Sequence, residues 1–264
     1  ATGYHAIEFL LWGQDLNGTG PAPADRKGTP QERHAGNRPH TDFDPKQCTG
    51  GHCERRIEFL KAVTDLLVTD LEEMVGNWKK DGAARKAVEE DPKAGLIAML
   101  TGLGSLSYGE LAGERMKLGL MLHDPEEEHD CFSDNTHNSH FYDQIGIRNV
   151  YLGSYTRIDG KTVEGASLSE LVKARDPKLD VEVRAKLDAT VAAMQALRVR
   201  AETIETYDQM IADGNKEGNA VVQAAIDRLV DQTRSLERVI TLLDLGKVAI
   251  EGSDSLDKPD AVFK

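Results

Sequence analysis

Apolar residues recur at three- and four-residue steps through much of the chain, which is the spacing of amphipathic helices. The clearest example is a stripe formed by Ile57, Leu60, Val63, Leu67, Leu71, Met74, Val75 and Trp78. Asp65, Glu72 and Glu73 fall outside this stripe. The pattern predicts a long helix over 57–78 whose apolar stripe packs against a core.

Four further helices are predicted downstream, over 93–122, 141–151, 179–212 and 218–250. The last two are separated by a turn at 213–215 and form an αα-hairpin. The first of the four contains glycines that are costly inside a helix, namely Gly102, Gly104, Gly109, Gly113 and Gly119. They indicate close packing or an interruption there.

The two ends of the chain have different patterns. Residues 4–12 are apolar apart from His5 and Glu8, which predicts a short buried helix carrying two polar groups. Residues 13–51 are rich in Gly, Pro, Asn and Asp, so a long irregular loop is expected. The tail from Gly252 is expected to be loose.

Composition supports an all-α fold made of helical bundles. Aromatic residues are 5% of the chain and hydrophobic residues 39%, whereas 29% are charged. This balance suits amphipathic helices better than a β-sandwich. We expect a first segment at 1–152, which contains the short helix with His5 and Glu8, the long loop and the central helices. A second, at 153–264, contributes the C-terminal hairpin that completes the bundle.

The net charge of the chain indicates which classes of partner it can bind. The formal net charge is −13 and no stripe of Lys or Arg interrupts it, so nucleic acid is not an expected partner. Cations are a better match for this surface. No run approaches the roughly 18 to 20 apolar residues that a membrane-spanning helix needs.

His5 and Glu8 are the first candidates for chemistry. Three residues apart on a helix, they lie on one face and can reach the same ion. An imidazole and a carboxylate suit iron, zinc, copper or manganese. A hydrogen-bonded pair without a metal is the simpler alternative, although the apolar neighbours imply burial, where an unpaired carboxylate is unfavourable.

A second concentration of polar groups lies between residues 123 and 140. It contains His123, His129, His137 and His140 together with Glu126, Glu127, Glu128, Asp130 and Asp134. Asp124 followed by Pro125 is typical of a helix start within it. The segment is either a solvated acidic loop or the part of the chain that completes a metal site begun by His5 and Glu8.

Two smaller alternatives concern the same segment. Glu126 and His129 form one Glu-x-x-His pair, whereas ferritin-like di-iron bundles use two such motifs with further glutamates. Cys131 is a conceivable nucleophile, but a buried structural thiol is the simpler interpretation.

Cys48 and Cys53 are close enough in sequence to form a small disulfide loop, which would leave Cys131 unpaired. A zinc knuckle is the competing interpretation of this pair, but two more ligands at suitable spacing do not follow nearby. Both interpretations stay open at this point.

Several enzyme classes lack their signatures in this sequence. There is no H-E-x-x-H or inverted metallopeptidase motif, no G-x-S-x-G elbow and no P-loop. A C-x-x-C-H haem attachment site is also absent. We therefore assign no catalytic residue.

Three separated motifs, in order, resemble a known family. Residues 3–13, GYHAIEFLLWG, resemble the G-x-H-x-x-E signature of imelysin-like proteins. The segments CTGGHC at 48–53 and EEHDCFSDNTH at 127–137 are similar to the branch that includes iron-regulated protein A. In the family, the signature follows a complete N-terminal helical bundle. Since it begins here at residue 3, we expect that bundle to be missing from this sequence.

The resemblance implies an all-helical metal-binding protein of the bacterial periplasm or outer-membrane surface that takes part in iron acquisition. Carried over by position, the motifs make His5 and Glu8 metal ligands and place Asp134 and His137 at the same site. Iron is the expected metal and zinc an alternative. Membrane-bound iron-uptake components are expected partners. The family is also classed with peptidases, so a metal-dependent peptidase is the alternative function.

Overall fold

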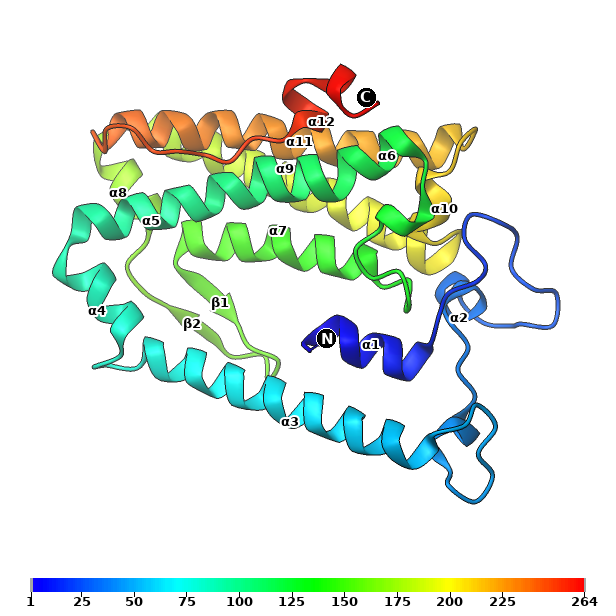
Figure 1. The fold of residues 1–264 in the computed structure, drawn as a ribbon. Helices are drawn as coiled ribbons and strands as arrows, with labels where there is room; N and C mark the ends of the chain where they lie inside the picture. The colour runs from blue at the N-terminus through cyan, green and yellow to red at the C-terminus, as the bar shows by residue number, and fades with distance from the viewer. Residues whose placement is uncertain (1, 264) are drawn as a thin grey trace.

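The computed structural model describes residues 2–263, which form a bundle of long helices with a smaller layer beside it (Figure 1). One rod of the bundle runs through α5 (Pro92–Ser105), η2 (Leu106–Lys117) and α6 (Leu118–Leu122). The other rods are α7 (Thr136–Leu152), α9 (Pro177–Thr203) and α11 (Lys216–Leu242). This confirms the all-α prediction.

The predicted helix 179–212 is wrong in its second part. α9 ends at Thr203, and a separate short helix, α10 (Tyr207–Ile211), follows. Thr206 starts α10 with a capping box, in which its side chain and that of Gln209 bind each other's backbone N–H groups. This local cap stops the long helix from continuing.

The helix predicted over 218–250 is also shorter than expected. α11 ends at Leu242, and residues 243–250 are not helical. Asp244 and Gly246 adopt left-handed backbone conformations, with φ 53° and 78°, which an α-helix cannot contain.

The core consists of two clusters of fully or nearly fully buried side chains along the bundle. One joins α5, α7, α9 and α11 through Leu100, Ile147, Leu187 and Leu236. The other joins η2, α9, α10 and α11 through Met116, Met194, Tyr207 and Leu229. Helices on both sides of residue 152 contact one another, α7 with α9 and η2 with α11.

The C-terminal tail is packed, which corrects the expectation that it is loose. It packs against η2, a π-helix, at the positions of the glycines. An added Cβ at Gly109 would lie 2.6 Å from the Glu251 carbonyl oxygen, and one at Gly113 would lie 2.3 Å from Ser253 Cβ. Tyr108 also donates a hydrogen bond to Asp257 at 2.6 Å. The glycines therefore make room for the tail.

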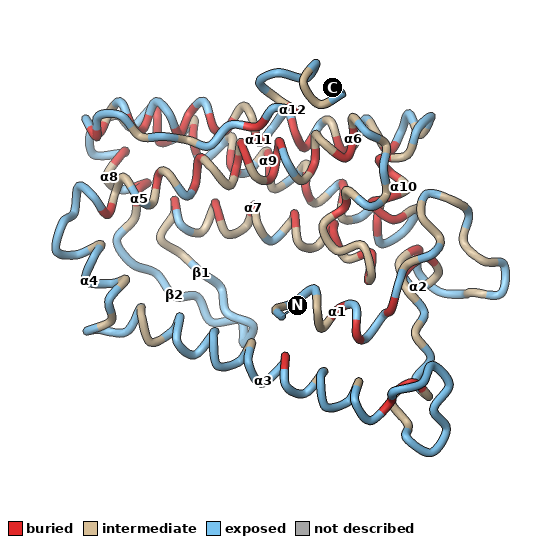
Figure 2. Tube along the Cα trace, in the orientation of Figure 1, coloured by how far each residue is buried: buried red, intermediate tan, exposed pale blue. Residues whose placement is uncertain are grey.

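A second layer, formed by α1 (Tyr4–Trp12) and α3 (Cys53–Trp78), lies beside the bundle and is largely exposed (Figure 2). Both helices were predicted, but their burial was not predicted correctly. In α3 the buried residues are Cys53 and Val63, while Trp78 is 57% exposed. In α1 they are Glu8 and Leu10. The main neighbours of α3 among residues 2–263 are α1, α4 (Ala83–Glu90) and η1 (His40–Phe43), which leave most of its apolar stripe uncovered.

Short elements connect these helices. The long N-terminal loop contains α2 (Pro30–His34) and η1 (His40–Phe43). The remaining elements are α4 (Ala83–Glu90), η3 (Pro125–Glu127), the antiparallel strands β1 (Ser154–Thr156) and β2 (Thr162–Glu164), α8 (Leu168–Arg175), α12 (Asp254–Asp257) and η4 (Pro259–Ala261). Asp124 caps η3 as expected, since its side chain accepts a hydrogen bond from the Glu126 N–H.

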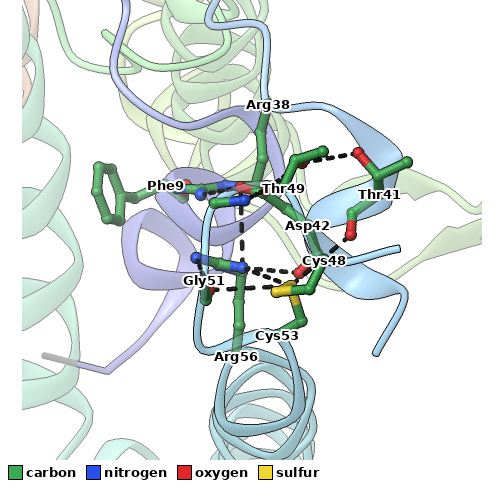
Figure 3. A network of polar contacts seen from close by, with 10 residues as sticks. Phe9, Arg38, Thr41, Asp42, Cys48, Thr49, Gly51, Cys53 and Arg56 are labelled. Carbon is green, nitrogen blue, oxygen red and sulfur yellow. Dashed lines mark hydrogen bonds and ion pairs between the residues drawn. A yellow bond between two sulfur atoms is a disulfide. The ribbon is translucent and has the colours of Figure 1, made fainter. Parts of the chain in front are cut away.

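Cys48 and Cys53 form a disulfide at the start of α3 (Figure 3), so these thiols are not available to a zinc ion. Among residues 2–263, none of the helices combines the length and hydrophobicity that crossing a bilayer requires.

Asp42 forms hydrogen bonds with several segments of the chain near this disulfide (Figure 3). Its carboxylate accepts hydrogen bonds from Arg38 at 3.1 Å, from Thr49 at 2.8 Å and from the Gly50 N–H at 2.6 Å. Arg56 of α3 donates to the Asp42 carbonyl at 2.7 Å. The hydrogen bonds to its carboxylate, with Thr49 the largest contributor, lower the pKa of Asp42, so the network is held by a charged carboxylate.

Candidate metal centre

Helix α1, which carries the predicted ligands His5 and Glu8, is held at both ends by glycines and by one arginine. Gly3 precedes it with φ 85° and Gly13 follows it with φ 77°, conformations that favour glycine. The Gly13 N–H donates to the Phe9 carbonyl and closes the last turn. Arg38 donates its backbone N–H to the Trp12 carbonyl at 2.8 Å and its guanidinium to the Phe9 carbonyl at 3.3 Å. The loop after α1 thus returns to hold it.

His5 and Glu8 point toward each other, as their spacing predicts. His5 Nδ1 lies 2.8 Å from Glu8 Oε2. The other oxygen, Glu8 Oε1, accepts hydrogen bonds from the Phe132 N–H at 3.2 Å, the Ser133 N–H at 2.9 Å and the Ser133 hydroxyl at 2.7 Å. Glu8 therefore joins α1 to the segment that follows η3.

That segment brings two more candidate ligands to His5. A nitrogen of His5, a nitrogen of His129 and an oxygen of Asp130 all lie within 4.8 Å of one another. The His5 and His129 rings meet edge to face, with centroids 4.8 Å apart, and His5 Nδ1 lies 3.8 Å from Asp130 Oδ1. His5 is about half exposed, so the cluster opens to solvent.

Hydroxyl groups at the start of α7 hold Asp130 in place. Ser139 donates to its carboxylate, and Thr136 Oγ1 accepts its backbone N–H at 2.9 Å. Thr136 also donates to Glu128 at 2.8 Å. The hydrogen bonds of α7 therefore orient the acidic segment ahead of it.

The histidines around this cluster are held neutral by burial. Burial lowers the pKa of His129 and of His137, and it lowers the pKa of His140 to about 3. His140 is fully buried beside His129, and neither of its ring nitrogens has a hydrogen-bond partner in the described chain. Neutral imidazole is the form that binds metals.

The structure separates the four predicted ligands. Asp134 does not join His5 and Glu8 in one ligand group; it lies with Glu128 and Asp208 in a second, fully buried cluster. His137 is buried, with Nε2 3.1 Å from the Asn138 side-chain nitrogen and Nδ1 without a partner. It belongs to neither cluster. The ligand roles of all four residues stay predictions.

His129 was noted in the sequence as part of the polar segment and of a Glu-x-x-His pair, and Asp130 as part of the segment, but neither was predicted as a ligand beside His5. Residues 128–135 are irregular, and no periodicity indicates which of their side chains face α1. The Glu126 and His129 pair does not lie on one helix, because Glu126 is in the exposed η3 and His129 follows it. A ferritin-like arrangement of this pair is therefore not present.

Cys131 fits the structural interpretation better than the nucleophilic one. It is partly buried and has no disulfide partner. Burial raises the pKa of its thiol to about 12, which keeps it protonated. A protonated thiol is a poor nucleophile.

The donor set of the cluster fits a transition metal. Two imidazoles and one carboxylate, from His5, His129 and Asp130, form the set that iron(II) takes in mononuclear non-haem proteins, and zinc accepts it too. Glu8 holds the ring of His5, in the way that a carboxylate commonly orients a metal-bound histidine.

Comparison with known proteins agrees with this picture of the fold. The crystal structure of a protein named as an iron-regulated protein A precursor, from Parabacteroides distasonis, superposes with a TM-score of 0.58 at 17% sequence identity. The match covers 92% of this chain and 73% of that one. No match was found among curated proteins. The family model described as imelysin, Peptidase M75, matches residues 1–236. The chain belongs to the imelysin family.

Proposed function

We propose that this protein binds iron outside the cytoplasm of a bacterium, as part of iron acquisition, with His5, His129 and Asp130 as ligands and Glu8 as the partner of His5. The observation that carries the proposal is the approach of these three donors to within 4.8 Å of one another. The exposure of His5 gives an ion in solution access to the site, as a protein that takes up and releases its cargo requires.

Two further observations support the location and the cargo. Disulfides such as Cys48–Cys53 persist mainly in oxidising compartments, including the bacterial periplasm. The similar structure from Parabacteroides distasonis bears the name of an iron-regulated protein precursor. Transfer of the ion to membrane-bound uptake components is the remaining part of the proposal.

Peptidase activity is the alternative suggested by the family's other name. It would need a carboxylate free to activate a metal-bound water. Glu8 is engaged on both oxygens, by His5 and by the Phe132 and Ser133 groups, which argues against this role for it. Metal binding is therefore the better-supported function.

The test is a titration of the chelator-treated protein with iron(II), under exclusion of oxygen, and with zinc(II). We expect one equivalent to bind. His5→Ala, His129→Ala and Asp130→Asn should each weaken binding by more than the roughly ten- to hundredfold that losing an outer partner of a ligand costs. His40→Ala, at an exposed histidine, is the control and should bind as wild type. Unchanged affinity in the three variants would refute the site.

A further inference from the structure

The buried cluster of Glu128, Asp134 and Asp208 is separate from the candidate iron site. Glu128 and Asp134 come from the segment between η3 and α7, and Asp208 comes from the first turn of α10. One carboxylate oxygen from each residue lies within 4.8 Å of the other two. The three residues are buried, with Asp134 and Asp208 fully inaccessible to solvent. Three acidic groups this close and this deeply buried require a counter-charge or protons.

Several polar atoms at the cluster lack partners among the described residues. Both carboxylate oxygens of Asp134 and one of Asp208 make no hydrogen bond. The hydroxyl of Tyr207, the residue before Asp208 in the chain, is fully buried and has none either, and the charge of Glu128 acts on it. Buried polar groups are nearly always paired, so these atoms point to a missing ligand.

The charges of the described residues near the cluster leave an excess of negative charge. Asp15 adds a further negative charge, which raises the pKa of Asp134 and of Asp208 beyond the effect of burial. Arg26 is the basic group that acts on Asp134, and its guanidinium is bound to the carbonyls of Arg33 and Ala35 at 3.1 and 2.6 Å.

The arrangement can accommodate one cation. Ligands on opposite sides of a calcium ion, each bound at about 2.4 Å, are about 4.8 Å apart, so three oxygens that lie within 4.8 Å of one another can reach the same ion. Both oxygens of Asp134 and one of Asp208 have no partner among the described residues and are available to it.

We propose that Glu128, Asp134 and Asp208 form a second cation site, selective for a hard divalent ion such as Ca²⁺. A site built from oxygen donors alone suits Ca²⁺, Mg²⁺ or Mn²⁺, and of these Ca²⁺ accepts six to eight oxygens in a flexible arrangement. The ion ties α10 to the segment 128–135. Because that segment also carries His129 and Asp130, the second ion supports the candidate iron site from within the protein.

The experiment uses the full chain after chelator treatment and follows Ca²⁺ binding by calorimetry and by the midpoint of thermal unfolding. Wild type should bind one equivalent and unfold several degrees higher at saturation, since an ion bound to the folded state alone stabilises it. Asp134→Asn and Asp208→Asn should each lower the affinity at least about tenfold, because calcium affinity follows ligand charge. Asp70→Asn, at an exposed carboxylate of α3, is the matched control.

Without ions, the two variants should be at least as stable as wild type, because each replaces a buried acid, whose charged form is disfavoured by burial, with a neutral amide, and this result shows that they fold. His5→Ala and His129→Ala should keep the Ca²⁺ response, which separates this proposal from the iron site. If wild type binds none of Ca²⁺, Mg²⁺ and Mn²⁺, or if the two Asn variants bind Ca²⁺ as wild type does, protons neutralise the cluster and the proposal is wrong.

Discussion

The two oxygens of Glu8 have different partners, and this difference defines how the candidate iron site is held. Oε2 contacts His5, whereas Oε1 accepts three hydrogen bonds from Phe132 and Ser133. Glu8 therefore has two roles in the proposed site. It orients the imidazole of His5 toward the ion, and it binds α1 to the segment that supplies the other ligands.

Ser133→Ala tests this linkage at the level of one hydroxyl. The variant loses the 2.7 Å hydrogen bond to Glu8 and keeps the two backbone donors. We expect a loss of about 1 kcal/mol in the free energy of unfolding. Iron affinity should fall about tenfold, because Glu8 orients His5. Both are measured by titration and urea unfolding, with Ser154→Ala as control. Wild-type iron affinity in Ser133→Ala would show that Glu8 does not position the site.

His140→Leu tests how burial of a neutral imidazole affects stability. The unfolded chain takes up a proton near pH 6.5, whereas burial lowers the pKa of folded His140 to about 3. The native state is thus stabilised above the unfolded pKa and loses this stability as the pH falls between the two values. The slope of unfolding free energy against pH should be smaller in His140→Leu by about 1.4 kcal/mol per pH unit. Urea unfolding between about pH 6 and about pH 4 gives both slopes. Equal slopes would contradict the assignment.

Among single residues, the sequence predicts the contact of His5 with Glu8, but not which other side chains lie beside them. The His5 and Glu8 contact follows from helical spacing, because both residues lie on one regular helix. Asp134 and His129 lie in an irregular segment, where side-chain direction depends on backbone turns such as the left-handed conformation of Asp134, φ 51°. Such turns have no period in the sequence.

Among the elements, η2 and the C-terminal tail depend on each other through glycines. Gly109→Ala would place a Cβ 2.6 Å from the Glu251 carbonyl oxygen, whereas Gly102→Ala would meet nothing within 4 Å. We expect the first change to cost about 1–3 kcal/mol of unfolding free energy. The second should add about 0.5–1 kcal/mol. Thermal unfolding, together with proteolysis of the tail, measures both, and equal effects of the two changes would contradict tail packing.

Helix positions were predictable because their stripes are long and regular, while helix ends were less so. α9 stops at the Thr206 capping box, and α11 stops before Asp244 and Gly246. Each of these helix-ending signals covers only a few residues, whereas the apolar periodicity continues beyond it and predicts a longer helix. The packing of the tail was not predictable, because the glycines of η2 indicate close packing but do not identify the segment that packs against them.

In the whole molecule, the bundle and the layer of α1 and α3 differ in burial. Most of the apolar stripe on α3 is exposed, whereas α11 buries residues along its full length. Elements with few buried apolar contacts open locally at low free energy. We therefore expect the amides of α3 to exchange with solvent deuterium well before those of α11. Equal protection of the two helices would show that α3 is covered in solution.

Anomalous X-ray diffraction at the iron edge would locate an iron ion held by His5, His129 and Asp130. Crystals of the chelator-treated protein would be soaked with iron(II) under exclusion of oxygen. We predict the strongest anomalous peak between these three side chains, within bonding distance of each. A strongest peak elsewhere, including at Glu128, Asp134 and Asp208, or the absence of any peak, would contradict it.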